Sequence, residues 1–268
     1  MRVLTSIALA SCVVAVGCAG TPATSPVVVS TPLASATVAS SVVPATSTPS
    51  RTPKLRECAD GQHCEVAPGS YVTGPNGFFP GLEITIPANW FLSEQDAGEF
   101  ALRPNDDPDN AMLLWKDVRV VATTRRSGLA NAIVAEVART PDAFVKWFTS
   151  NSAFAVIEQP KAATIAGTTG TIFAIEVSKS ADYGDPGCPS NPRCADLVTD
   201  PAHWGPNFLS IGGDSAVRLY VATVTYSDGD HLFAVAWDAT SATKLQTFAE
   251  RTQPIIASIR LPTEYIRN

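Results

Sequence analysis

The sequence lacks any run of basic residues. It carries 19 Lys and Arg against 25 Asp and Glu, a formal net charge of −6, and its densest basic site is the pair Arg125-Arg126. Proteins that bind nucleic acid use clustered Lys and Arg to neutralise phosphates. Docking on anionic lipid needs a similar cluster. The charge balance therefore argues against both classes, and we expect no nucleic-acid partner.

Motifs of hydrolytic enzymes are also missing. No G-x-S-x-G sequence is present. The S-x-x-K sequence at Ser241–Lys244 stands without the S-D-N and K-T-G companions found in penicillin-recognising enzymes. We interpret this stretch as the start of a helix and expect no catalytic residues.

Patterns of metal ligands are equally scarce. The only histidines are His63, His203 and His231, and none forms an H-x₃-H or H-E-x-x-H arrangement. The stretch Asn105–Asn110, NDDPDN, gathers carboxylates but lacks the glycine and the distant glutamate of an EF-hand loop. We interpret it as an acidic connection between strands, and we expect neither a metal nor a cofactor.

Charge is absent from most of the first fifty residues. After Arg2 no Asp, Glu, Lys or Arg occurs until Arg51. Charged residues make up 16% of the chain, against about 25% in an average soluble protein. Because the deficit is local, the N-terminal region differs in kind from the rest of the chain.

The first residues have the pattern of an export signal. Arg2 precedes an uncharged run, Val3–Gly17, of about 15 residues. A transmembrane helix needs about 20 apolar residues, whereas the core of a signal peptide has about 7–15. The pattern therefore predicts a signal peptide over residues 1–17.

Two cysteines follow small residues, as the lipidated cysteine of bacterial lipoproteins does. LASC ends at Cys12 and AVGC ends at Cys18. Cleavage before Cys12 would leave an apolar core of about nine residues, at the short end of the usual range, and would keep VVAVG on the mature chain. We therefore favour Cys18 as the lipid-attachment site and the link to the membrane. The alternative is an ordinary secretory signal with incidental cysteines.

A segment rich in Ser, Thr, Pro, Ala and Val covers residues 18–56. It has no aromatic residue and no helical or strand periodicity, so it cannot bury enough surface to offset the entropy of ordering. We expect a disordered linker with a root-mean-square span of roughly 35 Å. Such a linker would hold a domain away from a membrane.

Residues 57–266 are predicted to form one globular α+β domain: an antiparallel sheet with two main helices packed on it. Strands are predicted at 82–87, 99–104 and 111–123, and hairpins at 155–180 and 216–239, the second turning at Asp228-Gly229. Helices are predicted to begin after Thr140 and after Thr240 or Ser241. No parallel βαβ repeat is visible, which favours α+β.

Several short stretches carry a family resemblance. GLEITIPANW, FALRP, TPDAFVKWFTSN, IAGTTGT and IIASIRL together resemble the PsbP-like extracytoplasmic lipoproteins of bacteria, including the LpqN type of mycobacteria. The resemblance covers most of residues 70–262. It implies an α/β/α sandwich with an antiparallel sheet and helices on both faces. It implies no shared catalytic residues.

Four cysteines lie in the predicted domain: Cys58, Cys64, Cys188 and Cys194. In an exported protein an even number of cysteines predicts disulfides, and we favour the two local pairs, 58 with 64 and 188 with 194. A zinc site is the alternative, but the spacing within each pair is wider than the usual zinc-ligand spacing.

The stretch around the second cysteine pair is predicted to be a loop of about 30 residues. Loops of this length are either functional or disordered, so residues 182–208 are the first candidate for a ligand or partner surface. His203 and the adjacent Trp204 are its candidate residues. The other tryptophans lie on predicted elements and are expected in the core.

These observations predict a cell-envelope lipoprotein whose domain binds an unknown protein, small molecule or glycan outside the membrane. The alternative is a weak extracytoplasmic hydrolase that uses His203 with a carboxylate such as Asp200. A third possibility is a purely structural component of the envelope.

Overall fold

The computed structural model describes residues 52–264, apart from residue 60 and the ranges 124–132, 180–193 and 200–207. Its elements, in chain order, are β1 (Cys64–Glu65), β2 (Gly69–Val72), β3 (Glu83–Ile86), β4 (Trp90–Gln95), β5 (Glu99–Pro104), β6 (Ala111–Lys116), β7 (Arg119–Val120), α2 (Pro141–Ser150), β8 (Phe154–Ile165), β9 (Thr168–Val177), β10 (Cys194–Thr199), β11 (Phe208–Gly212), β12 (Ala216–Tyr226), β13 (Gly229–Ala239) and α3 (Ala242–Ser258).

An eight-stranded sheet forms the centre of the fold, in the order β1-β4-β5-β6-β13-β12-β9-β8. Every neighbouring pair in this sheet is antiparallel. A three-stranded sheet, β11-β10-β7, and the pair β2-β3 accompany it. The prediction of an α+β fold with an antiparallel sheet and two main helices is confirmed.

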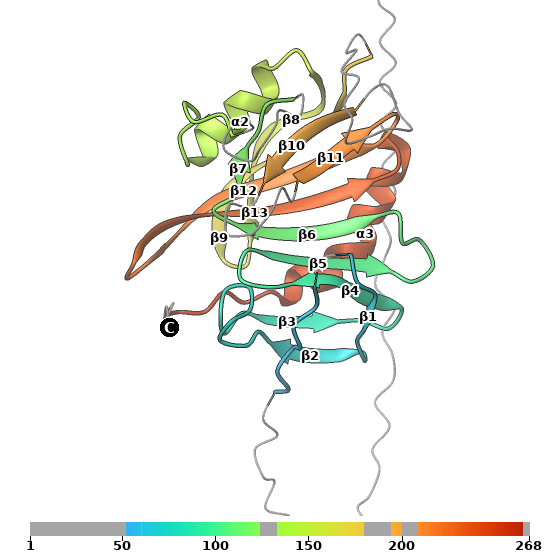
Figure 1. Cartoon of the computed structure of the whole chain (residues 1–268), viewed down its shortest axis with the longest axis vertical. Coiled ribbons are helices and arrows are strands. Elements are labelled where there is room, and N and C mark those ends of the chain that lie inside the picture. The colour runs from blue at the N-terminus through green and yellow to red at the C-terminus, as the bar shows by residue number, and fades with distance from the viewer. Residues whose placement is uncertain (1–51, 60, 124–132, 180–193, 200–207, 265–268) are drawn as a thin grey trace, which may run out of the picture. The chain divides into compact units, whose positions relative to one another are not determined.

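Both faces of the central sheet are covered. Along β13, Phe233, Val235 and Trp237 belong to one hydrophobic cluster, and the intervening Ala234 and Ala236 belong to a second. This alternation follows from the pleat of a strand. The first cluster lies under α3 and the β2-β3 pair, and the second lies under α2 and the three-stranded sheet (Figure 1). One helix therefore packs on each face.

Both helices begin where the sequence predicts. Thr140 caps α2 by accepting a hydrogen bond from the backbone N–H of Ala143, and Pro141 opens the helix. Ser241 caps α3 by accepting from the backbone N–H of Lys244. The S-x-x-K sequence is therefore a helix start, as predicted.

The predicted strand at 111–123 is wrong in one respect, because it breaks into β6 and β7. Asp117 has a φ of 57°, in the left-handed region that interrupts an extended chain. β6 stays in the central sheet beside β13, whereas β7 pairs with β10 in the three-stranded sheet. The break therefore carries the chain from one layer to the other.

The predicted loop at 182–208 is also wrong in part, because residues 194–199 form β10. All six residues of this strand, CADLVT, are buried. A short strand buried on both sides has no polar-apolar alternation, so the pattern used for the other strands does not detect it. The remainder of this predicted loop lies outside the described residues.

Both predicted hairpins form, and the turn of the second is shifted by one residue. Tyr226 pairs with Gly229, so the two-residue loop is Ser227-Asp228 and not Asp228-Gly229. Ile165 pairs with Thr168, which leaves Ala166 and Gly167 as the other loop, both at positive φ. Two-residue hairpin loops of this kind favour such backbone conformations.

The chain enters the fold before residue 57. Lys54 forms a bridge with Val72, and the backbone N–H of Leu55 donates to the carbonyl of Val72 over 2.8 Å. The Leu55 side chain is only 5% exposed. The last residues of the predicted linker therefore belong to the folded unit.

Candidate functional site

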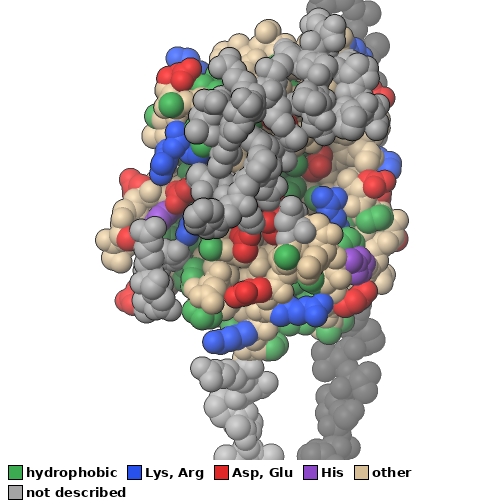
Figure 2. Space-filling view, in the orientation of Figure 1, with side chains coloured by type: hydrophobic (Ala, Val, Ile, Leu, Met, Phe, Trp, Pro, Cys, Tyr) green, Lys and Arg blue, Asp and Glu red, His purple; other side chains and the backbone are tan. Residues whose placement is uncertain are grey.

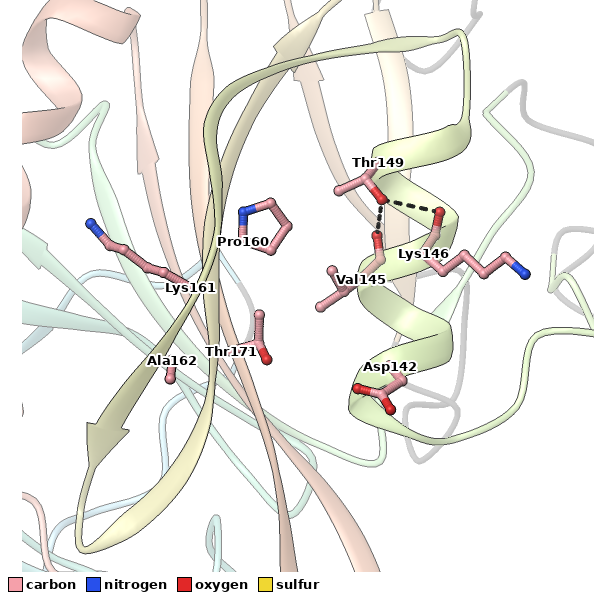
Figure 3. Close-up of a pocket in the computed structure, with 8 residues that line it drawn as sticks. All are labelled: Asp142, Val145, Lys146, Thr149, Pro160, Lys161, Ala162 and Thr171. Carbon is pink, nitrogen blue, oxygen red and sulfur yellow. Dashed lines mark hydrogen bonds between the residues drawn. The ribbon is translucent and has the colours of Figure 1, made fainter.

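A groove lies between helix α2 and the β8-β9 hairpin (Figure 3). It is a shallow groove, open to solvent, with a volume of about 440 Å³. The residues that line it are Asp142, Val145, Lys146 and Thr149 of α2, Pro160, Lys161 and Ala162 of β8, and Thr171 of β9. Ligand sites are commonly concave surfaces of about 300–1,000 Å³, which makes this groove a candidate binding site.

The sequence of α2 determines which side chains face the groove. Phe144 and Phe148 are buried against the sheet. Val145 comes directly after Phe144, and Thr149 comes directly after Phe148. Both therefore lie on the side of the helix next to the buried face. In Figure 3 they project toward the hairpin. The hydroxyl of Thr149 donates to the carbonyl of Val145 over 2.9 Å, which fixes its rotamer.

The hairpin supplies the opposite wall. Ala162 pairs with Thr171, so these two residues share a face of the sheet. Pro160 and Thr171 point toward the helix, whereas the side chain of Lys161 leaves on the other side of the strand (Figure 3). The wall is therefore built from small aliphatic and hydroxyl-bearing side chains.

Strand β8 ends the central sheet, but its outer edge is irregular. The register shifts between Val156 and Glu158 and again between Glu158 and Lys161, and Pro160 removes one backbone N–H. Bulges and prolines are devices by which natural proteins prevent another strand from pairing with an exposed edge. Recognition at this site would therefore use the side chains of the groove.

The groove carries charges of both signs at its borders. Its ionisable side chains are Asp142, Lys146 and Lys161. Among the eight lining residues there is no histidine, cysteine or serine.

A cluster of titratable groups lies away from the groove, at the β12-β13 turn. His231 contacts Asp117 through Nδ1 and Asp228 through Nε2, at 2.8 and 3.0 Å. Partial burial alone would lower the pKa of His231, but its hydrogen bonds to Asp117 and Asp228 outweigh this effect and raise the pKa above its usual value. The cluster joins the β12-β13 turn to Asp117, the residue that follows β6.

Asp238 is a second unusual group. It lies on β13, opposite Val217 of β12 and Ala111 of β6. Burial raises the pKa of its carboxyl to about 7, and the charge of Arg103 opposes the rise. A carboxyl that titrates near neutrality is a common feature of functional sites, but structural positions also produce it.

Most of the residues proposed from the sequence as functional lie outside the described part of the chain. These are the lipid-attachment candidate Cys18, the loop residues His203 and Trp204, and Cys188. The disulfide between Cys58 and Cys64 is confirmed. Cys194 is also disulfide-bonded, and its pairing with Cys188 stays a prediction.

The acidic stretch at 105–110 forms internal contacts. Asp106 accepts a hydrogen bond from Arg251 of α3, and Asn110 donates to Asp107. The side-chain oxygen of Asn110 accepts from the backbone N–H of Thr240. Within the described ranges, no three His, Cys, Asp or Glu side chains are placed to hold a metal ion. The stretch connects β5 to β6 and contacts α3.

The predicted positions of the tryptophans can be checked for four of the five. Trp90, Trp115 and Trp237 are buried, and Trp147 is half-buried against the cluster beneath α2. The assignment to the core is confirmed for the first three, whereas Trp147 packs at the edge of its cluster. On the face shown in Figure 2, acidic and basic side chains are interspersed.

Sequence reasoning did not find the groove or the His231 cluster. The groove residues are ordinary surface types, and they converge only because α2 packs beside a hairpin that follows it in the chain. Pro160 inside a predicted strand was the one available signal, because proline in a strand marks an edge or a bulge. His231 and Asp117 are far apart in sequence and meet through the pairing of β6 with β13.

No protein-family model and no curated protein matches the chain. Solved structures do match at low identity. LpqN of Mycobacterium tuberculosis, described as involved in cell envelope biogenesis, aligns over 73% of this chain and 91% of its own length, with 12% identity and a TM-score of 0.37. The Ran-binding protein Mog1p of Saccharomyces cerevisiae aligns over 74% and 96%, with 10% identity and a TM-score of 0.33.

A protein of Bacteroides thetaiotaomicron aligns over 70% of this chain with 10% identity and a TM-score of 0.33, and the chain covers only about half, 49%, of that protein. At these TM-scores the likenesses carry no argument about family or function. The description of the fold rests on the strands and helices themselves. No helix among the described residues is both long and apolar enough to cross a membrane.

Proposed function

We propose that this chain is a lipid-anchored, extracytoplasmic binding protein of the cell envelope. Its domain would hold a segment of a partner protein in the groove between α2 and the β8-β9 hairpin, without catalysis. The observation that carries the proposal is the groove itself, a hollow of about 440 Å³ beside a sheet edge that bulges and a proline protect from strand pairing.

The lining favours a protein segment over a glycan. Sugars are commonly held by stacking on aromatic rings, and none of the eight lining residues is aromatic. Val145, Pro160 and Ala162 offer aliphatic surface, and the hydroxyls of Thr149 and Thr171 can hydrogen-bond to a main chain. An extended peptide segment with aliphatic side chains offers both kinds of group.

The N-terminal sequence supports the location. A signal-like segment ends at Cys18 and is followed by a segment of uncharged Ser, Thr, Pro, Ala and Val residues. Lipid on Cys18 would anchor the mature chain, and the predicted linker would allow the domain to reach a partner away from the bilayer. A single anchored chain with a long linker raises the local concentration of the domain near other envelope proteins.

The alternative of a weak hydrolase rests on His203 and Asp200, which lie outside the described residues. No observation favours it. The binding proposal is therefore the one that the described side chains support.

Photo-crosslinking in intact cells tests the proposal. A photoreactive amino acid at Ala162, which shares a face with Thr171, should give one discrete crosslinked product. The matched control is Gln159, an exposed residue of β8 that is not among the lining residues of the groove. It should give little or none of that product.

A second variant checks that the groove itself is responsible. Val145→Arg places a long charged side chain in the groove and should abolish the product formed from position 162, with the thermal unfolding midpoint of the chain preserved. Equal products from positions 159 and 162 would contradict the proposal. So would a product from position 162 that survives Val145→Arg.

A further inference from the structure

Strand β8, at the edge of the central sheet, carries two more residues than its pairing with β9 requires. Val156 lies opposite Ile175 and Glu158 lies opposite Ala174, so two steps along β8 match one step along β9. Between Glu158 and Lys161, three steps along β8 match two steps along β9. Each extra residue forms a bulge. Glu158 therefore lies between two bulges.

The bulges decide which face of the sheet carries Glu158. Side chains alternate along a regular strand, so residues 156, 158 and 162 would share one face. Val156 packs in the cluster beneath α2, and Ala162 lines the groove beside α2. Glu158 instead lies opposite Ala174, which belongs to the cluster beneath α3. Val156 and Ala162 thus keep the face that a regular strand would give them, and Glu158 does not.

On the α3 face Glu158 meets Arg218 of β12. Ala174 is the pairing partner of both residues, and its short side chain leaves room for them to meet. Nε of Arg218 donates to Oε2 of Glu158 over 3.1 Å, and Nη2 donates to Oε1. Nη2 also donates to Oε1 of Gln246 in α3 over 2.8 Å. The Arg218 side chain is only 11% exposed, and such two-point contacts are stronger than a single exposed ion pair.

A regular strand is the competing arrangement of β8. The two-residue hairpin loop fixes the pairing at its own end, so without bulges Val156 would lie opposite Val177 in place of Ile175. Val156 would keep its face, whereas Glu158 would turn toward α2 and lose the guanidinium. Moving a carboxylate away from its partner to a less solvated position is unfavourable. The hydrophobic pattern permits both registers, and the ion pair favours the bulged one.

We propose that the ion pair between Glu158 and Arg218 is a register lock that keeps β8 bulged and closes this sheet edge to the β8 strand of a second copy of the chain. Without the pair, β8 becomes regular and two copies join edge to edge. A second copy fits because two identical antiparallel strands are self-complementary. Ile157, in the first bulge, is 38% exposed and supplies apolar surface for the joint. The lock goes beyond the proposed groove and does not depend on its being occupied.

Disulfide trapping in the full-length chain measures the register. Cysteines at positions 155 and 176 report the bulged form, because Ala155 lies opposite Glu176. Cysteines at positions 155 and 178 report the regular form, in which the pairing moves by two positions. Residues directly opposite in antiparallel strands lie within reach of a disulfide, whereas diagonal neighbours do not. Peptide masses after proteolysis identify each bond. Arg218→Met should raise the yield of the 155–178 bond at least fivefold.

Photo-crosslinking between two differently tagged full-length copies in intact cells measures the state of the edge. The photoreactive amino acid replaces Ile157, an exposed residue of β8. The otherwise unsubstituted chain should give little product that carries both tags. Arg218→Met should raise this product at least fivefold.

Matched variants connect both readouts to the ion pair. Glu158→Leu removes the acceptors at similar size and should act as Arg218→Met does, so it decides the outcome if Arg218→Met folds poorly. Combining Glu158→Arg with Arg218→Glu restores an opposite pair and should return both readouts toward their original values. Arg251→Met breaks an ion pair with Asp106, and both of these residues lie outside β8. It should change neither readout.

Three results would overturn the proposal. The first is a 155–178 bond that stays absent in both Arg218→Met and Glu158→Leu, which would mean that the bulges persist without the pair. The second is a shifted register without any product that carries both tags. The third is an equal rise of both readouts in Arg251→Met, which would indicate a general loosening of the fold.

Discussion

Nδ1 of His231 lies 2.8 Å from Oδ2 of Asp117, although 114 positions separate the two residues in the chain. The other carboxylate oxygen of Asp117 accepts a hydrogen bond from the backbone N–H of Leu232, and the N–H of Asp117 donates to the Leu232 carbonyl. These contacts hold the residue that follows β6 against the first residues of β13. It also makes the fold sensitive to the charge of one imidazole.

The His231 contacts predict a pH dependence of stability. Because the folded state raises the pKa of His231, the stabilisation is fully present below the unfolded pKa of about 6.5 and is lost as the pH rises through the folded pKa. His231→Asn should therefore lower the free energy of unfolding by roughly 1.5–3 kcal/mol at pH 5.5 and by less at pH 8.5. Urea unfolding at both pH values measures the difference. An equal loss at both would show that the imidazole charge contributes nothing.

At Asp238, by contrast, a substitution is expected to increase the free energy of unfolding. Burial raises the pKa of its carboxyl to about 7, so the folded state binds a proton that the unfolded state releases between about pH 4 and pH 7. Ionised Asp238 therefore destabilises the fold at alkaline pH. Asp238→Asn should increase the free energy of unfolding at pH 8 by about 1–2 kcal/mol, less than the full shift implies because the residue retains some solvent exposure.

The same substitution should have a smaller effect near pH 4, where the carboxyl is protonated in the folded state and about half protonated in the unfolded state. Chemical unfolding of Asp238→Asn and of the unsubstituted chain at pH 4 and pH 8 provides the comparison. A variant that is less stable than the unsubstituted chain at pH 8 would show that the carboxylate has a favourable partner.

Position 170 in β9 has no room for a side chain, which predicts that a larger residue there destabilises the fold. A Cβ at this position would lie 2.2 Å from the carbonyl oxygen of Val221 and 2.8 Å from Cβ of Ala222. Because β12 cannot move without disturbing its pairing with β13, Gly170→Ala should destabilise the chain by about 1–3 kcal/mol or more. The adjacent Thr169→Ala, at an exposed position, is the control. Similar unfolding midpoints for the two variants would be inconsistent with this packing.

The disulfide between Cys58 and Cys64 predicts a modest and local contribution to stability. It closes a short loop, and the loop-entropy model gives roughly 2 kcal/mol for a loop of this length. The double variant Cys58→Ala, Cys64→Ala should lose about that free energy of unfolding. Hydrogen exchange should accelerate at the backbone N–H groups of Cys58 and Gln95, which bond to each other's carbonyls. Unchanged exchange there would mean that the sheet edge holds without the disulfide.

The sequence was sufficient for elements that carry their own signals. Thr140 and Pro141 mark the start of α2, and alternating residues mark the long β12-β13 hairpin. It failed where the signal comes from distant residues. The strand at 194–199 is buried on both sides and shows no alternation, and the end of β6 depends on the contact between Asp117 and Leu232.

Sites were harder to predict than elements. Cys58 and Cys64 were paired correctly because their spacing is a local property. Glu158 and Arg218 lie on different strands, and only packing brings them into contact. Val145 and Thr171 share a groove for the same reason. Neither the composition nor the hydrophobic periodicity of the sequence predicts contacts between residues so far apart in the chain.

The intact mass of the protein extracted from membranes tests the lipid-anchored account most directly. We expect a mature chain that begins at Cys18 and carries a diacyl or triacyl adduct, with the adduct lost in Cys18→Ser and kept in Cys12→Ser. A mature chain that begins at any other residue, or one that carries no lipid, would contradict the account.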